Sequence, residues 1–351
     1  MQKQFTKNHS DMAKGLAILL LLFYHLFENE ELIVSLEVNH APFSREGFLL
    51  FSGFGNICVA VFVFLTAFGI ATGLLAQKDA LPEDLFWKTA YNQAAKRFFR
   101  LMLNFAVLYL SVNLLWWYKF DYQSLYGTDK QGIVLLLTDA LGLSMFFNTP
   151  TLNATWWYME IAYILIFLVP LLTWLTAKIG YPILLIAFFL PHAVTVEPDL
   201  QRYLFVAVFG VCAAYGKWLD KLLNLKLHPA FQWLAGIAGF ILCVLIRQNY
   251  VIHAYYAHLV DAPVALFLIF LAAALPGSLP VPGRALAFVG KHSMNIYLVH
   301  TFFYQILWRQ YIYQFKYAGI SFLLLLVSCI LYSVLLETVK KITKLQKLLS
   351  R

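Results

Sequence analysis

The sequence predicts an all-α, polytopic integral membrane protein, and three observations lead to this fold class. Hydrophobic residues make up 61% of the 351 positions, charged residues only 13%, and the mean hydropathy is +0.71. A soluble domain has a polar exterior and does not reach this composition. Apolar segments recur along the whole chain, with Trp and Tyr gathered at segment ends such as 116–118 and 156–158, as at a bilayer interface. We therefore expect one membrane-embedded domain over residues 1–351, with no separate soluble domain.

The number of spans follows from the distribution of basic residues. Eleven apolar segments lie between residues 14 and 338, among them 132–147, 181–196 and 286–307. A helical span needs about 20 residues. If the N-terminus is inside and the short segment 132–147 does not cross, 19 of the 26 Lys and Arg residues are cytoplasmic. If that segment crosses, the split becomes 12 inside and 14 outside. Basic residues concentrate in cytoplasmic loops, so we expect about ten transmembrane helices plus one short non-spanning or re-entrant helix at 132–147.

This topology places both termini in the cytoplasm and the acidic loop 28–46 outside the plasma (inner) membrane. The first apolar run is expected to remain as a helix, because it carries Lys14 and lacks an A-x-A cleavage site. Cytoplasmic loops account for the net charge of +8, so membrane lipids are expected partners and nucleic acid is not. The four cysteines lie in apolar runs without paired spacing, which indicates neither disulfides nor a metal site.

Ionisable residues inside the spans are the first candidates for function, because burying them in a bilayer is costly. Lys14 and His25 are 11 positions apart, so in a helix they share one face and lie about 16 Å apart along the axis. Lys14 falls at the cytoplasmic rim and His25 in the outer part of the membrane. Alternatively, Lys14 is a flanking charge that reaches the interface and His25 a buried structural histidine.

A second basic group stands where the third span begins on the cytoplasmic side. Arg97 and Arg100 are three residues apart and share a helix face. Guanidinium groups bind phosphates in a bidentate manner, so with Lys14 these arginines could form a cytoplasmic phosphate site. Taken alone, they are ordinary basic residues of a cytoplasmic rim.

On the outer side, two polar stretches enter the membrane near the expected depth of His25. In the first, Glu160 could orient an imidazole, whereas Trp156 and Trp157 are either interfacial residues or a stacking surface for a sugar ring. In the second, Asn295 and His300 lie inside a span. Hydrogen bonding between helices is the ordinary role of such an asparagine, and His300 is a candidate to orient His25 or to bind an acceptor.

Four stretches in this order resemble the motifs of the acyltransferase-3 family of membrane acyltransferases. Lys14 and His25 match its R/K-x10-H signature, and Lys96-Arg97-Phe-Phe-Arg100 matches its basic R-x-x-R segment. The stretch 61–68, VFVFLTAF, resembles F-F-x-L-S-G-F, and 290–300, GKHSMNIYLVH, resembles G-x-x-S-x-x-I-Y-L-x-H. The likeness extends over nearly the whole chain. Thr66 and Ala67 stand where Ser and Gly are common in the family.

The resemblance implies an acyl-CoA-dependent O-acyltransferase that moves an acyl group, usually acetyl from acetyl-CoA, to a hydroxyl of a cell-surface glycan. Lys14, Arg97 and Arg100 would then hold the donor phosphates. His25 would act as general base or transient acyl carrier, with Glu160 as its acid partner. Trp156, Trp157 and His300 would contact the glycan or lipid-linked saccharide.

Two other classes of protein would use the same intramembrane polar residues. A transporter or flippase of a lipid-linked saccharide needs them without acyl transfer, and consumption of a thioester by purified protein separates it from an enzyme. A non-catalytic assembly or sensor protein would not require the pairing of Lys14 with His25. The acceptor, the acyl chain and the oligomeric state are not encoded in any pattern of the sequence.

Overall fold

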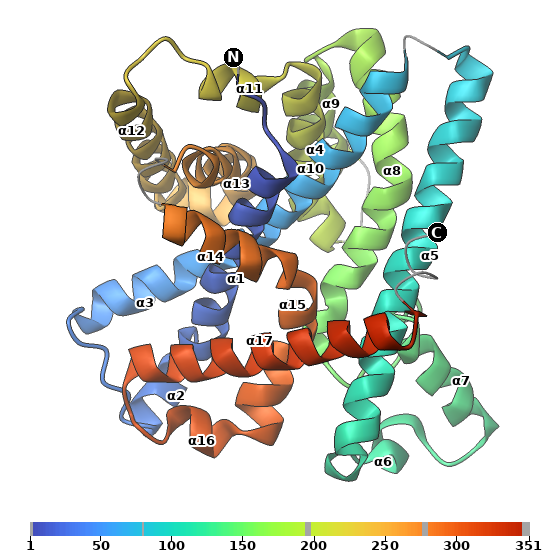
Figure 1. Cartoon of the computed structure of the whole chain (residues 1–351), viewed down its shortest axis with the longest axis vertical. Coiled ribbons are helices and arrows are strands. Elements are labelled where there is room, and N and C mark those ends of the chain that lie inside the picture. The colour runs from blue at the N-terminus through green and yellow to red at the C-terminus, as the bar shows by residue number, and fades with distance from the viewer. Residues whose placement is uncertain (1–2, 79–80, 194–197, 276–279, 346–351) are drawn as a thin grey trace. The chain divides into compact units, whose positions relative to one another are not determined.

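The structure is a computed structural model that describes residues 3–78, 81–193, 198–275 and 280–345. Within these ranges the chain is built from helices and turns, with one isolated bridge between Asn39 and Tyr317 (Figure 1). This confirms the all-α class.

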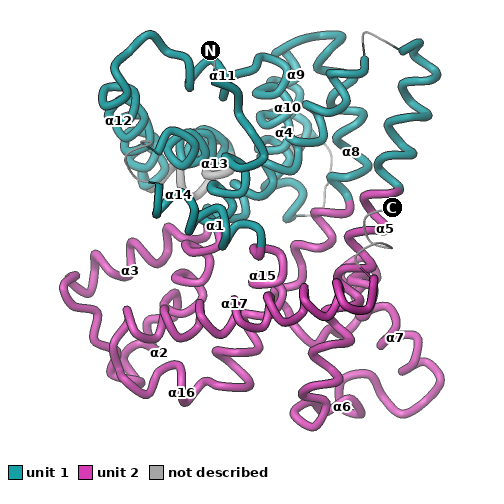
Figure 2. Tube along the Cα trace, in the orientation of Figure 1, with its two compact units in different colours: residues 1–17, 57–95, 164–291 teal, residues 18–56, 96–163, 292–351 magenta. Residues whose placement is uncertain are grey.

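The helices group into two compact units, each assembled from three separate stretches of chain (Figure 2). Unit 1 comprises Met1–Ala17, Ile57–Ala95 and Ile164–Lys291, and unit 2 comprises Ile18–Asn56, Lys96–Tyr163 and His292–Arg351. The boundary falls inside three helices, α1 (Lys7–Phe27), α5 (Glu83–Trp116) and α8 (Tyr158–Ile179). The single domain over 1–351 stays a prediction.

Six helical stretches in the described ranges are long and apolar enough to cross a membrane. They are Lys7–Phe27, Arg45–Lys78, Glu83–Lys119, Ala154–Ile179, Pro229–Arg247 and Ala318–Ile342. The chain is therefore a membrane protein with several apolar helices, whereas the predicted count of about ten spans is not confirmed.

Interruptions within the predicted spans explain part of the difference between the six long apolar helices and the ten predicted spans. The predicted span 286–307 is divided, because α14 (Pro280–Lys291) ends before α15 (Ser293–Thr301), and a π-helical segment, Phe302–Leu307, follows. In the predicted span 181–196 the structure has only the 11-residue α9 (Ile183–Ala193), and residues 194–196 lie outside the described ranges. Sequence hydropathy does not detect such breaks, because they depend on hydrogen-bond pattern rather than on composition.

The segment predicted not to cross contains the short helix α7 (Lys130–Ala140), which follows α6 (Tyr122–Tyr126). Eleven residues are fewer than the roughly 20 that a span requires. Asp139 at its end is buried and accepts hydrogen bonds from the Tyr126 hydroxyl (2.6 Å), the Ser144 hydroxyl (2.9 Å) and the Leu152 amide (2.8 Å). These partners satisfy the carboxylate and tie the segment to the rest of unit 2.

In unit 1, α4 (Cys58–Lys78) packs along α10 (Pro198–Tyr215), and a glycine permits the close approach. A Cβ at Gly210 would lie 2.8 Å from the Phe64 carbonyl oxygen. Small residues are used at such contacts between membrane helices. The unit also contains α11 (Trp218–Leu223), α12 (Pro229–Arg247) and α13 (Tyr250–Ala273).

In unit 2, α15 packs against α17 (Ala318–Ile342) through polar side chains. Asn295 donates to the Ser333 hydroxyl and to the Glu337 carboxylate, both at 2.9 Å. Glu337 also accepts from Lys340 at 2.8 Å, and Lys340 is buried. Asn295 therefore makes the helix–helix hydrogen bonds expected from the sequence. The unit also contains α2 (Glu30–Ser35), α3 (Arg45–Phe54) and α16 (Arg309–Tyr313).

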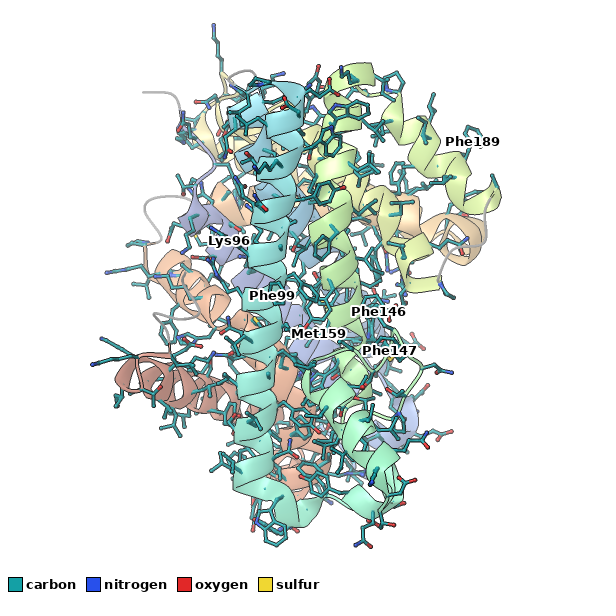
Figure 3. All side chains as sticks on the ribbon, turned by 90° about the vertical axis from the view of Figure 1, so that its right-hand side faces the viewer. Lys96, Phe99, Phe146, Phe147, Met159 and Phe189 are labelled. Carbon is teal, nitrogen blue, oxygen red and sulfur yellow. The ribbon has the colours of Figure 1, made fainter. Side chains whose placement is uncertain are left out.

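Apolar side chains cover much of the outer surface, as lipid-facing helices require. On α17, every fourth residue from Leu323 to Leu335 is an exposed aliphatic side chain, while Leu325 and Cys329 on another face are buried. Figure 3 shows Phe99 on α5 and Phe147 after α7, which are 60% and 65% exposed. A helix that is apolar on every face fits a hydrocarbon environment.

Candidate functional site

The candidate site is a cavity of about 340 Å³ within unit 2, at the end of α1. His25 and Glu28 form one wall, Asn29 and Leu32 a second, and the third consists of Tyr304, Gln305 and Arg309. Asn29 caps α2 by accepting the Leu32 amide at 3.0 Å, a common role of asparagine at a helix start. This cap turns the chain directly after α1 and leaves Glu28 beside the last turn of that helix.

His25 and Glu28 form a histidine–carboxylate pair on the cavity wall. The Nδ1 atom of His25 lies 3.1 Å from Oε1 of Glu28. An ionised carboxylate only accepts hydrogen bonds, so Nδ1 donates and Nε2 of a neutral ring keeps its lone pair. The side chains are 18% and 37% exposed, respectively. The pair therefore has the arrangement of a general base that is oriented by an acid.

The environment of Glu28 keeps this carboxylate ionised. Partial burial by itself would raise its pKa, but hydrogen bonds from His25 and Tyr24 outweigh that effect, and the pKa is lower than usual. An ionised Glu28 holds the His25 ring in one orientation and stabilises the imidazolium that forms when Nε2 takes a proton.

His300 lies next to His25, as expected from the similar depth in the membrane that the sequence predicted for both residues. The two ring centroids are 4.9 Å apart, and His300 is fully buried. Its Nδ1 lies 2.6 Å from the Tyr297 carbonyl oxygen, so this nitrogen donates and carries a proton. The Tyr304 ring packs on its other side, with the centroids 6.1 Å apart. His300 thus supports the His25 ring from the protein interior.

The π-helical segment and α16 supply the remaining wall of the cavity. Gln305 donates to the Tyr304 hydroxyl at 2.8 Å, and both side chains line the cavity. The Tyr313 hydroxyl donates to the Leu26 carbonyl oxygen at 3.0 Å, which fixes α16 against the end of α1. This contact places Arg309, the first residue of α16, at the same cavity as His25.

The turn that carries Trp156, Trp157 and Glu160 packs against α15. Trp156 is buried and donates from Nε1 to the Leu298 carbonyl oxygen at 2.9 Å. Its ring packs on Phe105 and Phe302, so it serves as a core residue of unit 2. Trp157 and Glu160 are half-buried, and Glu160 stands in the first turn of α8.

The predicted basic residues belong to different units. Lys14 is in unit 1, where its Nζ lies 3.9 Å from Asp11 Oδ1. Arg97, half-buried, and Arg100, exposed, lie on α5 in unit 2. Lys14 and His25 do share the uninterrupted helix α1, as predicted.

Sequence reasoning missed Glu28 and Arg309. Glu28 follows the apolar run and was interpreted only as the start of an acidic outer loop, although its i, i+3 spacing from His25 was a usable signal. No sequence pattern near Arg309 marks it as a site residue, because the turn after α15 brings it to the cavity. Across the described ranges, no group of three or more His, Cys, Asp and Glu residues could hold a metal ion.

Comparison with known proteins identifies the family of the chain. Residues 8–338 match the family described as an acyltransferase domain. No curated protein and no solved structure matches the chain. The fold and site define a membrane protein with a histidine–acid pair at an accessible cavity. The chain belongs to the acyltransferase-3 family, and acyl transfer is its general activity.

Proposed function

We propose that this protein transfers an acyl group, most simply acetyl, from cytoplasmic acyl-CoA to a hydroxyl of a cell-envelope or surface polysaccharide. The observation that carries the proposal is His25, whose Nδ1 is engaged by Glu28 and whose ring lines a 340 Å³ cavity. Family membership supports acyl transfer in general, and the pair supplies the base that an O-acyl transfer needs.

In the proposed step, Nε2 of His25 removes the proton of the acceptor hydroxyl. The hydroxyl oxygen attacks the thioester carbonyl, the new ester C–O bond forms, and the C–S bond breaks. The His25 imidazolium returns its proton to the departing thiolate, so the enzyme ends unchanged. Alternatively, His25 itself carries the acyl group briefly. Glu28 would orient the His25 ring in both routes, and in the general-base route it would also stabilise the imidazolium.

For the donor, we propose that Lys14, Arg97 and Arg100 bind the phosphates of acyl-CoA at the cytoplasmic rim. Guanidinium groups suit this task because they form paired hydrogen bonds to phosphate oxygens. Lys14 and His25 lie on one helix, about 16 Å apart along its axis. An extended pantetheine arm has a comparable length, so it would bring the thioester close to His25.

For the acceptor, we propose a glycan or lipid-linked saccharide that enters from the outer side of the plasma membrane. Trp157 and Glu160 are candidates to contact it, and Trp156 supports the turn that carries these two residues. His300, which is fully buried, would align the acceptor through the His25 ring. The proposed topology has both termini in the cytoplasm, although residues 1–2 and 346–351 lie outside the described ranges. No metal takes part in the proposed reaction.

The test combines a purified assay with an analysis of cells. Purified protein in proteoliposomes should consume acetyl-CoA in the presence of an envelope-glycan extract, and His25→Ala should lower this rate by about 10²–10⁴-fold without changing its gel-filtration profile. Mass spectrometry of envelope glycans from cells with and without the gene identifies the acyl group and its sugar. Glycan transport without any loss of thioester would instead support a flippase.

A further inference from the structure

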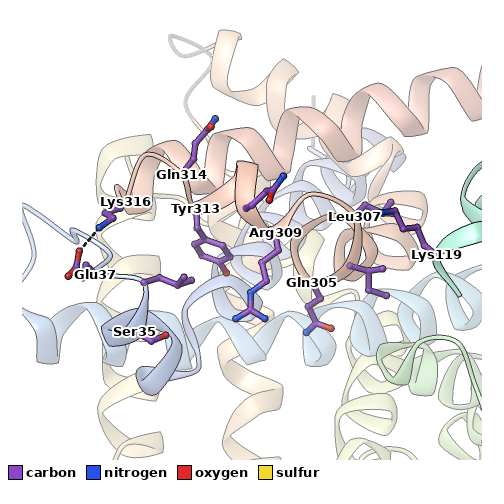
Figure 4. A pocket seen from close by; sticks show the side chains of 12 residues that line it. Ser35, Glu37, Lys119, Gln305, Leu307, Arg309, Tyr313, Gln314 and Lys316 are labelled. Carbon is purple, nitrogen blue, oxygen red and sulfur yellow. Dashed lines mark hydrogen bonds and ion pairs between the residues drawn. The ribbon is translucent and has the colours of Figure 1, made fainter. Parts of the chain in front are cut away.

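A second, larger cavity adjoins the candidate site inside unit 2. Its volume is about 850 Å³, and it shares two lining residues, Gln305 and Arg309, with the 340 Å³ cavity of His25. The two cavities therefore meet at these side chains. We call the larger one the basic groove, after the residues Lys119, Arg309 and Lys316 that line it (Figure 4).

The wall of the basic groove offers paired donors and acceptors. Gln305, Gln310 and Gln314 line it and are exposed. A carboxamide donates and accepts hydrogen bonds at the same time, which matches the hydroxyl groups of a saccharide. The volume exceeds that of the reaction cavity, so the groove has room for sugar units beyond the one that would meet His25.

The charges in the groove do not balance. Lys316 is neutralised by an ion pair with Glu37, drawn as a dashed line in Figure 4, and this pair lowers the pKa of Glu37. No carboxylate in the described part of the chain forms an ion pair with Arg309 or Lys119, and the Nζ atom of Lys119 lies 5.5 Å from the centroid of the Tyr118 ring. Two cations thus remain available to a ligand.

We infer that the basic groove binds an acceptor saccharide that carries an anionic group, either a carboxylate or a phosphate. Arg309 stands where the groove meets the reaction cavity, and its planar fork can hold such a group by two parallel hydrogen bonds. An anion bound there would place a neighbouring hydroxyl at His25. This inference rests on the proposed function, because it names the acceptor class of the same site.

Equilibrium binding to purified protein in phosphatidylcholine vesicles tests the groove separately from catalysis. The probes are an oligosaccharide ending in glucuronate, the same oligosaccharide after carboxyl reduction, and its 6-phosphate counterpart. We expect at least one anionic probe to bind about tenfold more tightly than the neutral one. This preference should disappear in Arg309→Gln and be partly kept in Arg309→Lys.

Arg45→Gln is the matched control, since Arg45 is also exposed in unit 2 but pairs with Glu30 and lines no part of the groove. The inference is overturned if charged and neutral probes bind equally or if none of them binds. It is also overturned if Arg309→Gln and Arg45→Gln bind the probes alike. It is also overturned if Arg309 instead governs binding to phosphatidylglycerol vesicles. His25→Gln should leave probe binding intact, so a failure of catalysis is distinguishable from a failure of the groove.

Discussion

Each unit contains a pair between a basic side chain and a carboxylate, and the two pairs differ in their access to solvent. In unit 1, Arg247 Nε lies 2.6 Å from Asp261 Oδ1, and both side chains are only 2% exposed. In unit 2, His25 and Glu28 are 18% and 37% exposed and open onto a cavity. Chemical type alone would make both pairs functional candidates.

The comparison shows that access separates a pair closed to any ligand from a pair that a ligand can reach. Arg247 and Asp261 join α12 to α13 and leave no space for a ligand between their 2%-exposed side chains. Such a sealed pair satisfies two costly charges in an apolar region. His25 keeps one ring nitrogen for a substrate, because only Nδ1 is taken by Glu28.

Removing one member of the sealed pair should destabilise unit 1 strongly. Asp261→Asn removes the negative charge that faces the buried Arg247 guanidinium, and breaking a buried ion pair in this way costs about 3–5 kcal/mol. The double variant Arg247→Met/Asp261→Leu removes both charges and should recover most of this loss. Thermal midpoints in detergent, followed by circular dichroism, provide the measurement. A double variant as unstable as Asp261→Asn would show that the pair has a role beyond mutual neutralisation.

Changing the acid of the open pair, His25 and Glu28, should affect the rate more than the stability. Glu28→Gln removes the charge that stabilises an imidazolium at His25, so we expect the acyl-transfer rate to fall about 10–100-fold, as for the loss of an orienting partner. Glu160→Gln is the comparison variant, because the sequence favoured that residue as the acid. Initial rates in the proteoliposome assay measure both. A larger loss for Glu160→Gln would assign the orienting role to Glu160 and contradict the role given to Glu28.

The pH dependence of stability should show a small effect of the open pair. Because the folded-state pKa of Glu28 is below its usual value, the pair stabilises the protein above the unfolded-state pKa of the carboxyl. That contribution is lost as pH falls through the lower folded-state pKa. The midpoint difference between wild type and Glu28→Gln should therefore shrink from pH 7 toward pH 4. A difference that grows on acidification would contradict the direction of this shift.

Part of the fold and of the candidate site could be predicted from the sequence. The apolar composition predicted helices, the short segment at 132–147 contains an 11-residue helix, and His25 and His300 were both placed in the outer half and prove to be neighbours. Helical periodicity also placed Lys14 and His25 on one helix. These features depend on local spacing, which the sequence states directly.

The rest depends on contacts between distant parts of the chain. Arg309 reaches the site because the Tyr313 hydroxyl bonds to Leu26, 287 positions away in the sequence. The break between α14 and α15 and the π-helical segment divided a stretch that hydropathy predicted as one span. Neither Glu28 nor Arg309 interrupts an apolar run, so neither residue stands out in the sequence as a charge inside a predicted span.

The central claim, that His25 is the base of an acyl transfer, is tested most directly by one rate comparison. Wild type, His25→Gln and His40→Gln are reconstituted in proteoliposomes with acetyl-CoA and envelope glycan, and formation of O-acetyl glycan is followed. His40 is the control, because it is a half-buried histidine of unit 2 that lines neither cavity. We expect a loss of about 10²–10⁴-fold for His25→Gln and wild-type rates for His40→Gln. Equal rates for all three proteins would contradict the claim.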